Sequence, residues 1–392
     1  MLRRAPVALL AAGIVASSAV VLSTGPAAAV TVTNEAELKA AFATDTQIDL
    51  QADIVLTDCT GGGAVERTAA VTDPVTVDGH GHTILQTCAD NVFLQDGSGV
   101  FTVQNLTITG GHASGNGGGI FAAGPVTVQS TTISGNRANA AGGGIASQGL
   151  ITVTSSTIDS NVSSGVGGGV SIGPDSPGAT FTDSTVSNNV CGGIATVPNA
   201  QQASVTAVNS TITGNTNGGS SLGSGIFSGG STTLVYTTVA RNVAGNFGNI
   251  DSAKLESFGS VVAESEGTGN CLATTTSHGY NYSDDDLCGF TEPTDHENAA
   301  PPQLGPLAAN GGPTSTLLPE PGSPLIDAIP IGSCKADGAA GLTTDQRGVA
   351  RPQGSGCDIG AVEVEVPMPP VPPVPPAPAP PTPVTVTPRF TG

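Results

Sequence analysis

One phrase of 25 residues recurs along the middle of the chain and constrains its fold more than any other feature. Consecutive copies begin at Phe101, Val126 and Ile151. One apolar residue closes a short run in each copy, namely Ile108, Ile133, Ile158, Val186, Ile212, Val239 and Val262. A second follows the glycines, at Ile120, Ile145, Val170, Ile194, Ile226 and Ile250. A repeat of this length is typical of a solenoid, in which each unit buries its apolar face against its neighbours.

The pattern inside each copy indicates strands. Apolar residues stand two positions apart, as in Val126 and Val128 or Ile151 and Val153. Alternation of this kind points side chains to one face of an extended chain, and β-branched residues favour that backbone. Stacked copies would pair as parallel strands, whose crossovers are right-handed in about 98% of cases. The sequence therefore predicts an all-β fold, a right-handed parallel β-helix (solenoid).

An asparagine follows the closing apolar residue by three positions in five copies, at Asn136, Asn161, Asn189, Asn215 and Asn242. Asparagine tolerates turn conformations and bonds to nearby amides. We expect these residues to form a structural amide ladder at one turn. A row of ligand-binding side chains is the alternative.

The ends of the chain differ in composition from the repeats. Residues 1–29 combine Arg3 and Arg4, an apolar run and a small-residue site at Ala27–Ala29, which indicates a signal peptide and export. Residues 366–392 hold 12 prolines, which predicts a disordered, semi-rigid tail.

Between these ends we expect three regions. Residues 30–47 should form an N-terminal cap of a strand and a helix, since Asn34 and Glu37 have capping-box spacing. Residues 48–265 should form the solenoid, because the apolar alternation extends back to Ile48. Residues 266–365 should form a C-terminal capping module.

Seven cysteines in an exported chain suggest disulfides. Spacing suggests the hypothetical pairs Cys59–Cys88, Cys271–Cys288 and Cys334–Cys357. Cys191 is left over and stands where other copies have the first glycine of a triplet, so we interpret it as a small buried residue.

The net charge of −20 argues against binding to nucleic acid or to other polyanions. No long apolar stretch follows the signal peptide, so we expect no membrane insertion after its cleavage. With 55 glycines and only 11% charged residues, the surface should consist of hydroxyls and amides. These properties favour a secreted or cell-wall-associated monomer, whose partner would be an extracellular glycan or cell-wall material.

The repeat phrase over residues 70–262 resembles the polymorphic outer membrane protein type repeat and the wider pectin-lyase-like superfamily. The segment after it resembles the module of secreted bacterial choice-of-anchor Q proteins. That resemblance rests on the runs Leu304–Leu307, Asn310–Thr314, Ser323–Ala328, Asp345–Gly348 and Cys357–Ala361. It implies export and a surface-associated role, and it implies no reaction.

Catalysis has little support in the sequence. Gly79-His80-Gly81 resembles a motif of pectin hydrolases, but we find no paired aspartates on adjacent coils to accompany it, so we interpret it as a turn. The run Asp284–Asp286 is interpreted as a solvated loop and not as a calcium site. We therefore predict no catalytic, cofactor-binding or metal-binding residues and no cofactor.

Arg347 and Arg351 lie near Asp345, Asp358 and Glu363 in the sequence, and we expect a structural ion-pair network among them. The leading functional hypothesis is a non-catalytic surface protein with a structural, adhesive or glycan-binding role. The alternatives are a carbohydrate-active enzyme (a polysaccharide lyase or glycoside hydrolase) and an inert stalk.

Overall fold

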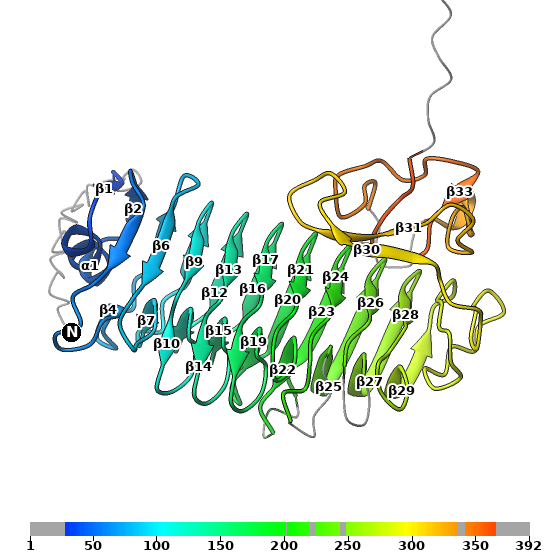
Figure 1. Cartoon of the computed structure of the whole chain (residues 1–392), viewed down its shortest axis with the longest axis horizontal. Helices are drawn as coiled ribbons and strands as arrows, with labels where there is room; N and C mark the ends of the chain where they lie inside the picture. The colour runs from blue at the N-terminus through cyan, green and yellow to red at the C-terminus, as the bar shows by residue number, and fades with distance from the viewer. Residues whose placement is uncertain are drawn as a thin grey trace, which may run out of the picture.

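The chain forms a long stack of coils of parallel strands, seen from the side in Figure 1. The computed structural model describes residues 28–365, apart from 199, 201, 220–224, 244–247 and 335–341. The predicted signal peptide, except its last two residues, and the whole predicted tail lie outside the described residues.

Parallel strands form three walls of the stack, which are called row A1, row A2 and sheet B. Row A1 of sheet A contains β1 (Val30–Val32), β2 (Gln47–Leu50), β5 (Val75–Asp78), β8 (Phe101–Gln104), β12 (Val126–Gln129), β16 (Ile151–Thr154), β20 (Gly178–Thr182), β23 (Ser204–Val208), β25 (Ile226–Val235), β27 (Ile250–Phe258) and β29 (Cys271–Ser277). Row A2 of the same sheet contains β4 (Val65–Arg67), β7 (Phe93–Gln95), β11 (Ile120–Ala122), β15 (Ile145–Ser147), β19 (Val170–Ile172) and β22 (Ile194–Thr196), and meets row A1 in β25.

Sheet B forms the third wall. It contains β3 (Ile54–Leu56), β6 (Thr83–Gln86), β9 (Thr107–Thr109), β13 (Thr132–Ser134), β17 (Thr157–Asp159), β21 (Thr185–Ser187), β24 (Thr211–Thr213), β26 (Thr238–Ala240) and β28 (Val261–Ala263). A short sheet C, made of β10 (His112–Ala113), β14 (Arg137–Ala138) and β18 (Val162–Ser163), lies between sheet B and row A2 in chain order.

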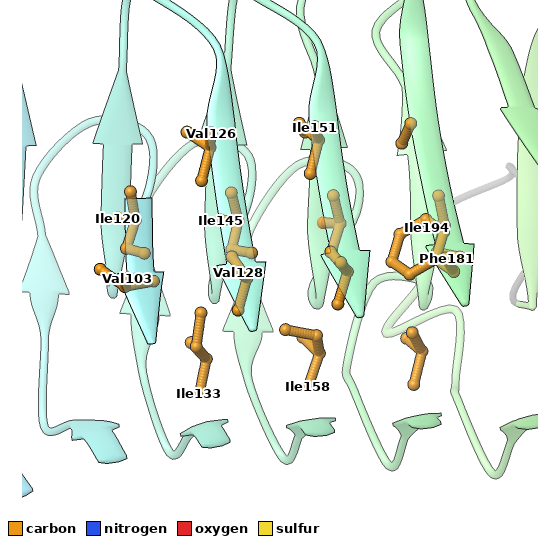
Figure 2. Packing of buried hydrophobic residues seen from close by; sticks show 14 of the residues in the cluster. Val103, Ile120, Val126, Val128, Ile133, Ile145, Ile151, Ile158, Phe181 and Ile194 are labelled. Carbon is orange, nitrogen blue, oxygen red and sulfur yellow. The ribbon is translucent and has the colours of Figure 1, made fainter. Parts of the chain in front are cut away.

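Strands of adjacent coils pair in a register that matches the 25-residue repeat. Val126 pairs with Ile151 and Val128 with Val153, in parallel. Ile133 pairs with Ile158 in sheet B. These side chains are fully buried, and those that Figure 2 labels form columns along the stack. Burying a Val or Ile side chain stabilises a fold by about 1.5–3 kcal/mol, so each coil adds to one continuous core.

One helix, α1 (Glu35–Thr44), lies at the N-terminal end of the stack (Figure 1). The Asn34 side chain accepts a hydrogen bond from the Glu37 N–H at 3.1 Å, which satisfies a helix N-terminal donor. Leu38 and Phe42 are buried on the inner face. The Phe42 ring lies 5.1 Å from that of Phe101, so the helix packs on the first coils of the core.

The C-terminal segment folds back along the outside of the stack. It contains an antiparallel pair, β30 (Leu304–Ala308) and β31 (Thr316–Pro319), a second pair, β32 (Ile329–Pro330) and β33 (Gly356–Cys357), and the 3-10 turn η1 (Ile331–Ser333). We call residues 304–363 the flank module. Figure 1 shows it over the later strands of sheet B.

Hydrogen bonds place the flank module along several coils. Thr185 donates to the carbonyl of Ser315, and Arg241 donates to the carbonyl of Leu304. All three residues of β21, β24, β26 and β28 are buried, whereas the outward residues of β9, β13 and β17 are half-buried. The flank module covers the outer face of these later strands.

The sequence predicts a C-terminal capping module over residues 266–365 but does not indicate which surface of the stack it covers. Residues just after β29 continue the stack, since Tyr282 bridges both Val261 and His296. The flank module instead finds its partners on the hydroxyl-rich outer face of sheet B.

Candidate functional site

The uncovered part of sheet B offers a regular polar surface. We call the outward side chains of β3, β6, β9, β13 and β17 the open flank. One row contains Thr83, Thr107, Thr132 and Thr157, paired in register from coil to coil. A second row contains Val55, Leu85, Thr109, Ser134 and Asp159. Hydroxyl groups thus recur at the spacing between stacked strands, about 4.8 Å.

A recess of about 410 Å³ opens at the edge of this surface. Its lining consists of His80, Gly81, Asn105, Leu106, Thr107, Ser130 and Thr132. Hydroxyl, amide and imidazole groups can each donate and accept hydrogen bonds. The lining therefore suits a ligand rich in hydroxyl groups.

Two aspartates and a histidine meet beside the recess. Asp49 of β2 and Asp78 of β5 are direct partners in the parallel pairing of adjacent coils. The His80 Nε2 atom lies 3.7 Å from an Asp49 oxygen, and its Nδ1 atom lies 3.7 Å from an Asp78 oxygen. One ligand atom from each residue falls within 4.8 Å of the others. We call these three residues the Asp–His corner.

The Asp78 carboxylate is held by neighbouring donors. It accepts hydrogen bonds from the His80 N–H at 3.0 Å, the Gln104 amide at 2.6 Å and the Asn105 amide at 3.1 Å. Burial raises the pKa of this carboxyl, but these donors outweigh burial and the pKa lies below its usual value. Asp78 is therefore a fixed, ionised group.

A second pair lies in the same turns. The His82 Nδ1 atom is 3.2 Å from an oxygen of Asp53, which also accepts the Thr83 N–H at 2.9 Å. The Thr83 N–H and the His82 side chain lower the pKa of the Asp53 carboxyl.

The expectation that no paired aspartates accompany His80 is wrong. Asp49 and Asp78 are 29 residues apart, because the first coil contains the long turn at residues 57–64. The segments QIDL and VTVD both alternate apolar and polar residues, and in each the aspartate directly follows an inward apolar residue. Aligning these two segments would have predicted that the aspartates are neighbours.

The asparagines stack inside the solenoid. The amide of Asn136 donates to the side-chain oxygen of Asn161 at 3.0 Å, and contacts of the same type join Asn161 to Asn189, Asn189 to Asn215 and Asn215 to Asn242. The row continues through Asn249 and Asn270, at 2.9 and 2.8 Å. Asn249 directly precedes Ile250, and Asn270 directly precedes Cys271. They therefore do not share the three-residue spacing of the other five, and the sequence pattern did not predict them. All of these side chains are buried and do not face solvent.

Three disulfides join Cys59 to Cys88, Cys271 to Cys288 and Cys334 to Cys357. Cys191 is a free, buried cysteine. Burial raises the pKa of its thiol, which makes it a poor nucleophile.

The described residues of the flank module include two buried ion pairs. Arg347 contacts Asp345 at 2.9 Å, and Arg351 contacts Glu363 at 2.9 Å. Asp358 accepts the N–H groups of Asp327 and Val364. Gln346, which precedes Arg347 in the sequence, joins the flank module to sheet B. Its amide donates a hydrogen bond to the Thr185 hydroxyl, and its side-chain oxygen accepts one from the Thr211 hydroxyl.

The Arg351 guanidinium also lies 4.3 Å from the centre of the Tyr236 ring. Burial raises the pKa of Tyr236 to about 12 and that of Glu363 above its usual value. These groups face the protein interior and not solvent. In the loop 284–286, Asp284 and Asp285 accept backbone N–H groups of Glu264 and Asn270.

Comparison with known proteins gives two findings. A family profile described as a pectate lyase-like adhesive domain matches residues 29–156. A solved chain titled "L. reuteri 53608 SRRP" matches with a TM-score of 0.37 and 18% identity, over 63% of this chain and 98% of that chain. No curated protein matches this sequence. The profile match and the parallel solenoid fit a pectin-lyase-like β-helix, and the match covers four of the five strands of the open flank, β3, β6, β9 and β13.

None of the described helices has the length and apolar character that crossing a membrane requires.

Proposed function

We propose that this protein is an exported, non-catalytic adhesive β-solenoid that binds extracellular polysaccharide on the open flank. The observation that supports it is the division of sheet B. The flank module buries β21 to β28, while β6 to β17 leave rows of threonine hydroxyls and the recess accessible. The family profile for an adhesive domain covers β6, β9 and β13 of this accessible part.

The chemistry favours a neutral or weakly charged glycan. The net charge of −20 repels polyanions over long distances. Hydroxyl and amide groups of the recess can exchange hydrogen bonds with sugar hydroxyls, and the exposed Leu85 side chain can contact the apolar face of a sugar ring.

The test is binding of the exported chain to an array of plant and microbial polysaccharides. Thr107→Glu and Thr132→Glu would place charge in the recess and should abolish retention. Thr127→Glu, on the outer face of row A1, is the control and should bind like the parent. Binding that survives both recess changes would contradict the location, and retention on no glycan would favour an inert stalk.

The Asp–His corner supports a second candidate, a glycan hydrolase. Hydrolysis by two carboxyl groups requires one to be protonated as a general acid. The pKa of Asp78 is lowered and its carboxyl group is ionised, which counts against Asp78 as the general acid. Release of reducing ends or unsaturated sugars at catalytic rates, lost in Asp78→Asn, would favour the enzyme over the adhesin.

Further elements of the proposal concern organisation. We propose a right-handed winding, from the preference of parallel crossovers. We propose that residues 1–29 direct export, which the three disulfides support because such bonds persist in oxidising compartments. We also propose that α1 shields the first coil and that the flank module is of the choice-of-anchor Q type.

A further inference from the structure

We propose that Asp49, Asp78 and His80 form a binding site for a divalent first-row transition cation such as Zn²⁺. The three residues lie on adjacent coils, two on row A1 strands and one in the turn that leaves β5. Their ligand atoms fall within 4.8 Å of one another, so small side-chain rotations bring them around one ion. Ligand distances at such an ion are about 2.0–2.2 Å.

The ligand set selects the class of cation. An imidazole nitrogen suits zinc, nickel, copper or iron, whereas calcium and magnesium prefer sites made of oxygen ligands alone. Two carboxylates supply the negative charge that offsets the ion. Three protein ligands leave positions for water, which agrees with a His80 side chain that is 49% exposed.

The surroundings hold the ligands ready. Asp78 is fixed by the His80 N–H and the amides of Gln104 and Asn105, and these donors act as outer partners of a metal ligand. Asp49 has no other partner than the His80 ring among the described residues, so its carboxylate is available. Without a cation, two carboxylates in register on neighbouring strands repel each other, and like charges directly opposite destabilise a sheet.

Other histidines of the described chain lack this arrangement. His82 faces only Asp53, and His278 lies 3.9 Å from Glu256 alone. His278 has a similar exposure, 47%, and one carboxylate partner. It therefore provides a matched control for unspecific binding of cations to a histidine and an acidic surface.

The test is calorimetric titration of the full chain with ZnCl₂, and separately with CaCl₂. We expect one saturable zinc site with at least tenfold weaker binding of calcium. His80→Ala and Asp49→Asn should each weaken zinc binding at least tenfold, while His278→Ala should leave it within twofold. Far-UV circular dichroism would verify that each variant keeps its fold.

A second measurement avoids substitutions altogether. Titration of the unaltered chain with Co²⁺ should produce visible absorption bands of a nitrogen- and oxygen-ligated ion, and these bands should disappear on adding Zn²⁺. Equal zinc affinity in the parent and in His80→Ala, equal affinity for calcium and zinc, or the absence of saturable binding would each overturn the proposal.

Discussion

Replacing Asn161 by alanine tests the amide ladder at its most connected point. The Asn161 side chain accepts two hydrogen bonds from Asn136, from its N–H and its amide, each at 3.0 Å. It donates to the carbonyl of Ile133 at 2.9 Å and to the oxygen of Asn189 at 3.1 Å. The residue is fully buried, so water cannot replace these bonds without opening the turn.

The magnitude follows from these contacts. The buried N–H of Asn136 loses its acceptor, and an orphaned buried group costs about 1–3 kcal/mol. The other three bonds are each worth about 0.5–1.5 kcal/mol net. Because neighbouring groups relax in part, we expect the free energy of unfolding to fall by about 3–5 kcal/mol.

Urea unfolding followed by far-UV circular dichroism measures this change. Thr157→Ala, an outward residue of the same coil, is the matched control and should alter the free energy by less than about 0.5 kcal/mol. If Asn161→Ala is no more harmful than Thr157→Ala, the ladder does not stabilise the solenoid as argued.

Three further predictions concern the flank module, pH and a disulfide. Arg351→Met leaves Glu363 buried without its partner and should cost about 3–5 kcal/mol, seen as faster proteolysis of the flank module than of the solenoid, and unchanged cleavage would count against the ion pair. Burial raises the pKa of Asp251, Asp358 and Glu363, so each binds its proton more tightly when folded. The melting temperature should therefore rise as the pH is lowered from neutral toward the ordinary pKa range of carboxyl groups, and a lower melting temperature over that interval would disprove this. Replacing both Cys271 and Cys288 by serine removes a link across 17 positions and should cost about 3 kcal/mol in urea unfolding, against no loss for Cys191→Ser beyond about 1 kcal/mol.

The stacked core could be predicted from sequence because it repeats. Val126, Val128 and Ile133 recur at a constant interval, and stacking in register is the arrangement that buries all copies at once. The same interval located Asn161 and its partners at one turn. Local periodicity is sufficient where each coil copies the one before it.

The remaining features depend on where the repeat is broken. Asp49 and Asp78 are paired on adjacent coils, although the coil between them is longer than the 25-residue repeat. The repeat interval therefore does not predict their pairing. The flank module could not be placed, because nothing in the sequence of residues 304–363 indicates which outer surface Gln346 contacts. Gln346 lies 161 residues from Thr185 and 135 residues from Thr211 in the sequence, and these separations carry no periodic signal.

The flank module changes how the stack would respond to a mechanical load. A bare solenoid can peel away one coil at a time, because each coil contacts only its neighbours. Here, contacts from Thr185 to Arg241 tie several coils to one covering segment, so they must yield together. If a ligand bound to the open flank were pulled, the force would separate the uncovered N-terminal coils first. The half that bears the open flank would thus act as the compliant part of the molecule, and the covered half as its rigid base.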